Sequence, residues 1–166
     1  MTTKADYTAE EWELLRKAPL IMAAAVIVSD LSGSVGVARE FLSMAQAVEE
    51  TAQRHDANEL VAALVADLQS PQGANEEETE DITDIAEARA KSLAESREIA
   101  EALARKSPPA EAEGFKRWML SIAERVSKAA REGGVLGIGS KLVSEKETTM
   151  IDELAKALGV DMAQPN

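Results

Sequence analysis

The segment FKRWMLSIAERVSKAA, residues 115–130, has the clearest periodicity in the chain. Its apolar residues recur three or four positions apart: Phe115, Trp118, Met119, Ile122, Val126, Ala129 and Ala130. This spacing places them on one face of an α-helix, whereas a strand would show strict alternation. The segment therefore predicts an amphipathic helix that packs its apolar face against other helices.

Apolar patterns on both sides of this segment predict further helices. The stretch 20–29 is apolar on every face, which is typical of a buried central helix. Apolar residues also have helical spacing at 37–48, 60–68, 82–103 and 150–158. No segment alternates convincingly in the way a strand does. We therefore expect an all-α, single-domain bundle of six or seven helices.

Short signals predict where several helices begin and end. Thr8 followed by Glu11 is a capping box, which predicts the start of a first helix. Ser144 followed by Glu147 has the same spacing and predicts the start of the last helix. Gly159 predicts the end of that helix, because glycine readily adopts the left-handed conformation found there.

Loop signals interrupt the chain without dividing it into domains. We expect one helical domain over 1–166, with an internal loop at 70–76, a Ser-Pro-Pro helix break at 107–109 and a frayed tail at 163–166. A chain of 166 residues is long enough to enclose a single hydrophobic core.

Two segments show the same arrangement. Each has an apolar helix, then a loop with at least two glycines, and then a second helix. They cover 20–48 and 118–158. One interpretation is a pair of pseudo-symmetric hairpins with the acidic middle helix lying across them. The other is that such hairpins are common in any helical bundle.

The charge balance argues against several classes of partner. The chain has 30 acidic and 18 basic residues and a net charge of −12, so its surface repels nucleic-acid phosphates. The longest apolar run, Leu20–Val28, is far shorter than the roughly 18 residues of a membrane span. We expect no nucleic-acid binding and no membrane insertion. The lack of cysteine and of an apolar leader in 1–16 favours a cytoplasmic protein.

Basic residues concentrate around the predicted helix at 115–130. They are Lys116, Arg117, Arg125, Lys128, Arg131 and Lys141. They would meet either an acidic partner or the chain's own acidic helix, and the second alternative is the simpler because it relieves self-repulsion.

No pattern in the chain points to catalysis. His55 is the only histidine, which argues against a di-iron bundle and a histidine-rich zinc site. No Gly-x-Ser-x-Gly motif accompanies it. The glycine-rich stretch 133–140 ends in Ser140, and Lys141 follows it, which is the reverse of the P-loop order. We expect no enzyme, no catalytic residue and no organic cofactor, with a carboxylate-based hydrolase or lyase as the least favoured alternative.

The same glycine-rich stretch contains candidate partner-binding residues, Val135, Leu136 and Ile138. Packed inward, they would complete an ordinary helix–helix loop, whereas exposed apolar residues would bind a partner. Our leading prediction is a non-enzymatic helical protein that acts through interaction or assembly, with a protein partner or with a second copy of itself.

The stretch 76–84 contains six acidic residues and no basic one. Hard cations such as Ca²⁺ and Mg²⁺ accept oxygen ligands of this kind. A solvated helix start or an acidic linker has the same composition and needs no ion.

Two parts of the chain resemble tellurite-resistance TerB-like proteins, over about a third of its length. VSEKE at 143–147 and IDELAKALGV at 151–160 are similar to the closing helix of those proteins. The stretch 23–30, with Gly33 and Glu40, is similar to their alanine-rich helix and acidic turn. The resemblance implies a small acidic helical bundle that is linked to stress responses and to cation binding.

Under this alternative, carboxylates of the chain would bind Ca²⁺ or Mg²⁺. The candidate metal ligands are Asp30, Glu40, Glu76, Glu77, Glu80 and Asp81. Separately, residues 115–159 are similar to uncharacterised bacterial helical proteins, a likeness that implies a fold and no function.

Overall fold

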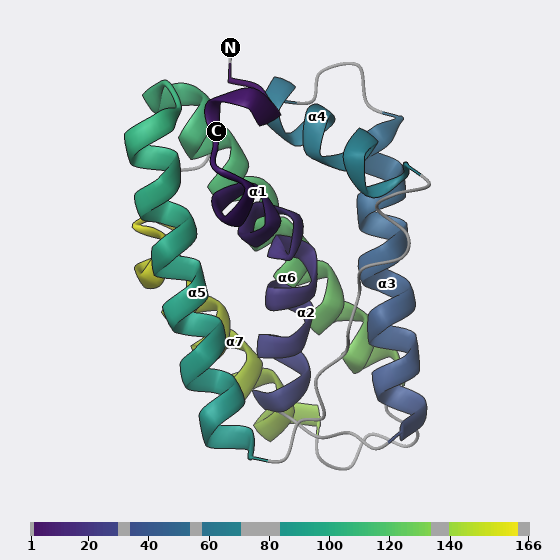
Figure 1. The fold of residues 1–166 in the computed structure, drawn as a ribbon. Helices are drawn as coiled ribbons and strands as arrows, with labels where there is room; N and C mark the ends of the chain where they lie inside the picture. The colour runs from purple at the N-terminus through teal and green to yellow at the C-terminus, as the bar shows by residue number, and fades with distance from the viewer. Residues whose placement is uncertain (1, 30–33, 54–57, 71–83, 134–139, 163–166) are drawn as a thin grey trace.

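The computed structural model describes residues 2–29, 34–53, 58–70, 84–133 and 140–162. A short 3-10 turn, η1 (Lys4–Asp6), precedes the helices. These are α1 (Ala9–Arg16), α2 (Ala18–Ser29), α3 (Ser34–Ala52), α4 (Glu59–Leu68), α5 (Ile85–Lys106), α6 (Pro109–Gly133) and α7 (Ser140–Leu158). The described ranges contain seven α-helices and no strand, so the predicted all-α bundle is confirmed (Figure 1).

The core forms around α2 and α6. α2 packs against α3, α5, α6 and α7, and Met22, Ala23 and Ala25 on it are completely buried. From α6, Phe115 and Met119 are equally inaccessible to solvent. The all-round apolar stretch and the amphipathic stretch thus have the positions that their patterns predicted.

The two helix–loop–helix segments pack directly on each other, chiefly through α6 against α2 and α3. α5 lies alongside α2 and α7, and Figure 1 shows α3 and α5 on opposite sides with α2 and α6 between them. α4 covers one end of α3 and α6. This arrangement leaves one long side of α5 facing α7, where the site described below forms.

Two predicted helix ends are confirmed. The Thr8 hydroxyl accepts a hydrogen bond from the Glu11 backbone N–H, and the Glu11 carboxylate accepts one from the Thr8 N–H. Gly159 ends α7 with a φ of 67°. Its left-handed turn lets the Val160 N–H reach the Ala155 carbonyl at 2.9 Å, as in a Schellman motif.

The predicted start of the last helix is wrong. α7 begins at Ser140, so Ser144 and Glu147 lie within the helix and not at its N-terminus. The Glu147 side chain is 1% exposed and accepts a hydrogen bond of 2.6 Å from the Ser127 hydroxyl of α6. The spacing of a capping box also occurs between residues inside a helix, and here Glu147 packs against α6.

Lys4, Trp12 and Arg16, near the N-terminus, all contact the carboxylate of Asp67 on α4. The Trp12 indole N–H and the Lys4 ammonium donate to its carboxylate at 2.9 Å each, and the Arg16 guanidinium lies 3.3 Å away. Burial opposes ionisation of Asp67, but these donors and positive charges outweigh it and hold the pKa of the carboxyl below its usual value. Nearby, Thr2 donates to the Glu111 carboxylate of α6.

The predicted breaks in the chain lie partly in the described ranges. Ser107 and Pro108 separate α5 from α6 at the Ser-Pro-Pro sequence. Of the predicted loop at 70–76 only Ser70 is described, and the predicted tail at 163–166 lies outside the described residues. Among the helices that the structure describes, none combines the length and the apolar character needed to cross a membrane.

Candidate functional site

Most of the residues predicted to bind a metal or a partner lie outside the part of the chain that the structure describes. These are Asp30, Glu76, Glu77, Glu80, Asp81, Val135, Leu136 and Ile138. Glu40 on α3 is the one predicted metal ligand within the described ranges, where no group of three or more His, Cys, Asp or Glu residues could hold a metal ion.

Glu40 and Glu147 are both buried glutamates, each with 1% of its surface exposed. Each lies about two turns into the second helix of its hairpin, α3 or α7. A carboxylate is costly to bury unless polar groups compensate it, and the hydroxyl of Ser127 does so for Glu147. Glu40 is a candidate metal ligand from its sequence, whereas the sequence around Glu147 predicted a helix cap.

Three of the six basic residues around α6 form ion pairs with acids of the same chain. Arg125 forms two hydrogen bonds, of 2.5 and 2.6 Å, with Glu50 of α3. Lys116 and Arg117 each lie 3.1 Å from the carboxylate of Glu113 on their own helix. These three residues are therefore neutralised within the chain, but by acids of α3 and α6 and not by the acidic middle helix, and they offer little free positive charge to a partner.

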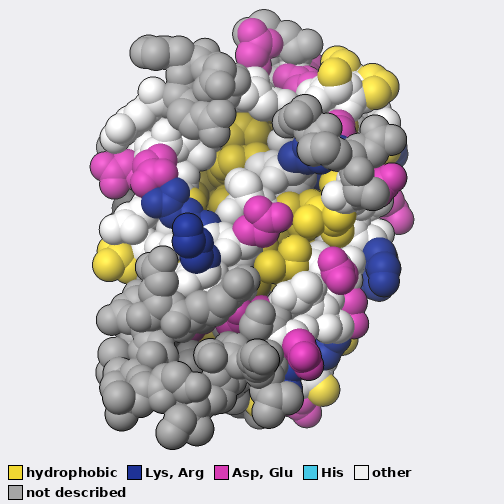
Figure 2. All heavy atoms as spheres, turned by 180° about the vertical axis from the view of Figure 1, so that it is seen from behind, with side chains coloured by type: hydrophobic (Ala, Val, Ile, Leu, Met, Phe, Trp, Pro, Cys, Tyr) yellow, Lys and Arg dark blue, Asp and Glu magenta, His cyan; other side chains and the backbone are white. Residues whose placement is uncertain are grey.

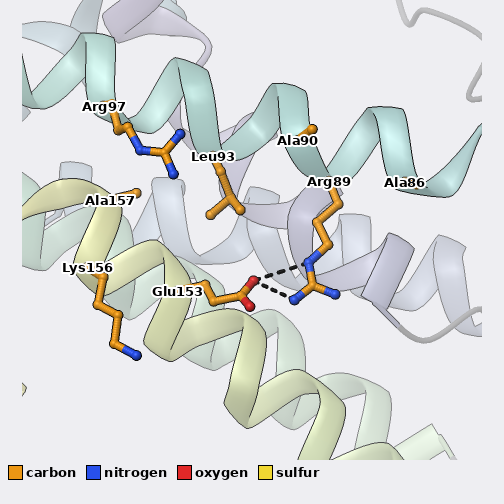
Figure 3. Close-up of a pocket in the computed structure, with 8 residues that line it drawn as sticks. All are labelled: Ala86, Arg89, Ala90, Leu93, Arg97, Glu153, Lys156 and Ala157. Atoms are coloured by element: carbon orange, nitrogen blue, oxygen red, sulfur yellow. Dashed lines mark hydrogen bonds and ion pairs between the residues drawn. The ribbon is translucent and has the colours of Figure 1, made fainter.

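A different basic surface lies between α5 and α7, in an open groove of about 510 Å³. Its walls are Ala86, Arg89, Ala90, Leu93, Arg97, Glu153, Lys156 and Ala157 (Figure 3). Each of these side chains is exposed or half-buried, so the groove belongs to the surface and not to the core.

An ion pair spans one end of this α5–α7 groove. Arg89 donates from Nε and Nη2 to Oε2 of Glu153, at 3.1 and 2.5 Å. At the other end, the Arg97 side chain points into the gap between the helices and the Lys156 side chain points away from α5 (Figure 3). Neither Arg97 nor Lys156 has an acidic partner among the residues that the structure describes. The groove therefore has one neutral end and one cationic end.

The middle of the α5–α7 groove is apolar. Leu93 lies half-buried between the two charged ends, and Ala90 provides a small, exposed surface beside it. From Ala86 to Arg97 the α5 wall covers 11 residue steps, or about 16 Å of helix.

The wider surface also combines apolar and charged groups. Figure 2 shows the molecule from behind, with apolar side chains gathered near the centre of the view and acidic and basic side chains around them. An apolar strip with charges at its edges can bind a ligand that has the same two kinds of group.

Comparison with protein-family models, curated protein sequences and solved structures finds no match to this chain. The resemblance to TerB-like proteins therefore stays a prediction, and the chemistry of the site rests on the geometry of its own residues.

Proposed function

We propose that this chain is a non-enzymatic helical interaction protein that binds a segment of a partner protein in the α5–α7 groove. The observation that carries the proposal is the cationic end of the groove. There Arg97 and Lys156 lie without an acidic partner in the described structure, on a chain with a net charge of −12.

Other described bases, such as Lys128, also lack an acidic partner, but Arg97 and Lys156 are distinguished by their place in the groove. With 30 acidic and 18 basic residues, most bases in the fold have acids available to them. Arg125, for example, is paired with Glu50 across two helices. An exposed ion pair contributes only about 0–1 kcal/mol, so a partner carboxylate would add modest affinity and much of the specificity. The remaining affinity would come from the apolar middle of the groove.

The shape of the groove favours a protein segment over a small molecule. Small-molecule sites usually enclose most of the ligand surface. This groove is lined by two helices only, and none of its wall residues is buried, so a small ligand would stay largely in water. A longer segment that follows α5 for three turns would contact the whole strip at once.

Site-specific photocrosslinking in the native host tests this proposal. A photoreactive amino acid replaces Ala90 in the groove and, as the control, Ala62, an exposed residue of α4. We expect a discrete protein adduct from position 90 and none from position 62. The yield of this adduct should fall when the Arg97→Glu and Lys156→Glu substitutions are added to the chain. No adduct specific to position 90, or one that both reversals leave unchanged, would contradict the proposal.

A second candidate function is binding of a divalent cation, which the TerB-like resemblance implies. The observation that favours it is the pair of buried glutamates, Glu40 and Glu147, at similar places in the two hairpins. Hard cations accept such carboxylate ligands. Calorimetric titration with Ca²⁺ and Mg²⁺ at low salt would give a saturable heat that Glu40→Gln abolishes in a still-folded protein. No saturable heat at millimolar ion would exclude this function.

A further inference from the structure

We infer that the segment bound in the α5–α7 groove is an amphipathic helix with an acidic residue one turn beyond its apolar stripe. This inference rests on the proposed function and specifies the chemistry of the partner. It follows from the spacing of the wall residues, from the small side chains between the two helices and from the unequal charges at the two ends.

The spacing of the α5 wall residues determines the spacing in the partner. Ala90, Leu93 and Arg97 lie three and four positions apart, on one face of the helix. Arg97 is one turn, about 6 Å, beyond Leu93. A partner helix that lies along α5 has the same rise per residue. Its apolar residues therefore recur three or four positions apart opposite Ala90 and Leu93, and its acidic residue comes one turn later.

The walls favour a helix over an extended strand. An added strand needs an exposed sheet edge for its backbone hydrogen bonds, and the described residues form no strand. A third helix packs side chains into the groove between two others and needs no free backbone group. α5 and α7 run in the same direction past the groove (Figure 3), and the small side chains of Ala86, Ala90 and Ala157 allow a third helix to approach closely.

The charges determine which end of the partner helix is acidic. Arg89 is already bonded to Glu153, so that end of the groove is neutral. Arg97 and Lys156 make the other end cationic. Arg97 and Lys156 attract a carboxylate at the facing position of the partner helix. They repel a lysine at that position, so a partner with a lysine there binds less well.

Three synthetic helical peptides test this inference by fluorescence anisotropy at low salt. The first carries Glu one turn after an apolar stripe of Leu and Ala. The second has Lys in place of that Glu, and the third has the same composition as the first with its apolar residues moved off the stripe. They are titrated against the wild-type chain, Arg97→Glu and Lys128→Glu. The last is a matched charge reversal at an exposed lysine of α6 outside the groove.

The wild type should bind the Glu peptide about tenfold more tightly than either of the other two peptides. Arg97→Glu should reverse the preference between the Glu and Lys peptides, and Lys128→Glu should leave it unchanged. Equal binding of the three peptides to the wild type, or a preference that Arg97→Glu does not alter, would overturn the inference. Circular dichroism of the variants ensures that a loss of binding is not a loss of folding.

The two experiments separate this inference from the proposed function. A specific adduct from position 90 together with equal peptide binding overturns the acidic helix and leaves the interaction function standing. The absence of that adduct contradicts the function itself, on which the inference depends. If the crosslinked segment of the partner has an apolar stripe with an acidic residue one turn beyond it, the result supports both the proposed function and this inference.

Discussion

Replacement of Gly114 by alanine should destabilise the fold, although glycine-to-alanine changes inside helices usually stabilise. Gly114 lies within α6, where alanine is favoured by about 0.5–1 kcal/mol over glycine. A Cβ at this position would lie 2.5 Å from Nδ2 of Asn58, well inside van der Waals contact. The outcome depends on how freely Asn58 can move.

Three hydrogen bonds hold the Asn58 side chain in place. Its Oδ1 caps α4 by accepting from the backbone N–H groups of Leu60 and Val61, at 3.0 and 3.3 Å. Its Nδ2 donates to the Glu111 carbonyl of α6 at 2.8 Å. Loss of such a cap costs about 0.5–2 kcal/mol, and loss of the hydrogen bond to Glu111 about 0.5–1.5 kcal/mol. Against the gain from alanine, we expect Gly114→Ala to destabilise by about 1 kcal/mol.

A double-mutant cycle measured by urea denaturation isolates this contact. Asn58→Ala alone should destabilise the protein by about 1–2 kcal/mol through the lost cap. In that background Gly114→Ala should become stabilising by about 0.5–1 kcal/mol, because the clashing amide is gone. The sign of the effect therefore reverses between the two backgrounds. If Gly114→Ala stabilises the wild type as much as the Asn58→Ala variant, the close contact has no energetic consequence and the reasoning is wrong.

Three other predictions concern stability and are checked by denaturation. The pKa of Asp67 is lower in the folded protein than in the unfolded chain, where it is near 3.8. The ionised carboxylate therefore stabilises the fold fully at a pH above 3.8, and this stabilisation is lost as the pH falls through the lower pKa of the folded state. Asp67→Asn should therefore be less stable than the wild type at pH 7, and the difference should shrink in acid. A constant difference would contradict the assigned pKa. Ser127→Ala should cost about 1–3 kcal/mol, since it removes a donor to the buried carboxylate of Glu147. A cost below about 0.5 kcal/mol would show that this hydrogen bond is unimportant. Phe115→Ala, at a completely buried site, should cost about 3–5 kcal/mol, whereas Leu42→Ala, at a site 58% exposed, should change stability by less than about 0.5 kcal/mol. Similar costs for the two changes would contradict the assigned core.

Most of the helices could be predicted because the signals for them are local. The apolar residues of 115–130 lie on one face only if that segment is helical, and α6 forms there. The stretch 20–29 has no polar face, which only a central position can satisfy, and α2 is buried by four other helices. The capping box at Thr8 and the stop at Gly159 likewise depend on neighbours in the sequence.

The failures involve residues whose role depends on distant partners. Ser144 and Glu147 match a capping box, but Glu147 lies inside α7 and accepts a hydrogen bond from Ser127 of α6. For Arg125 the sequence favoured an acid of the same chain, but it did not identify Glu50 of α3 as that acid. A local pattern has no information about such neighbours, since they come from segments far apart in the chain.

The sequence by itself determined the helical class, the central position of α2, the amphipathic face of α6 and the acidic character of the surface. These properties follow from side-chain periodicity and composition, which do not change with the arrangement of the helices. Only the tertiary structure decided which charges are neutralised and where a groove opens. Arg89 meets Glu153, while Arg97 and Lys156 stay unpaired in the described structure, because α5 and α7 pack side by side in one particular register. That register is set by the burial of their apolar faces against α2, to which both helices are packed.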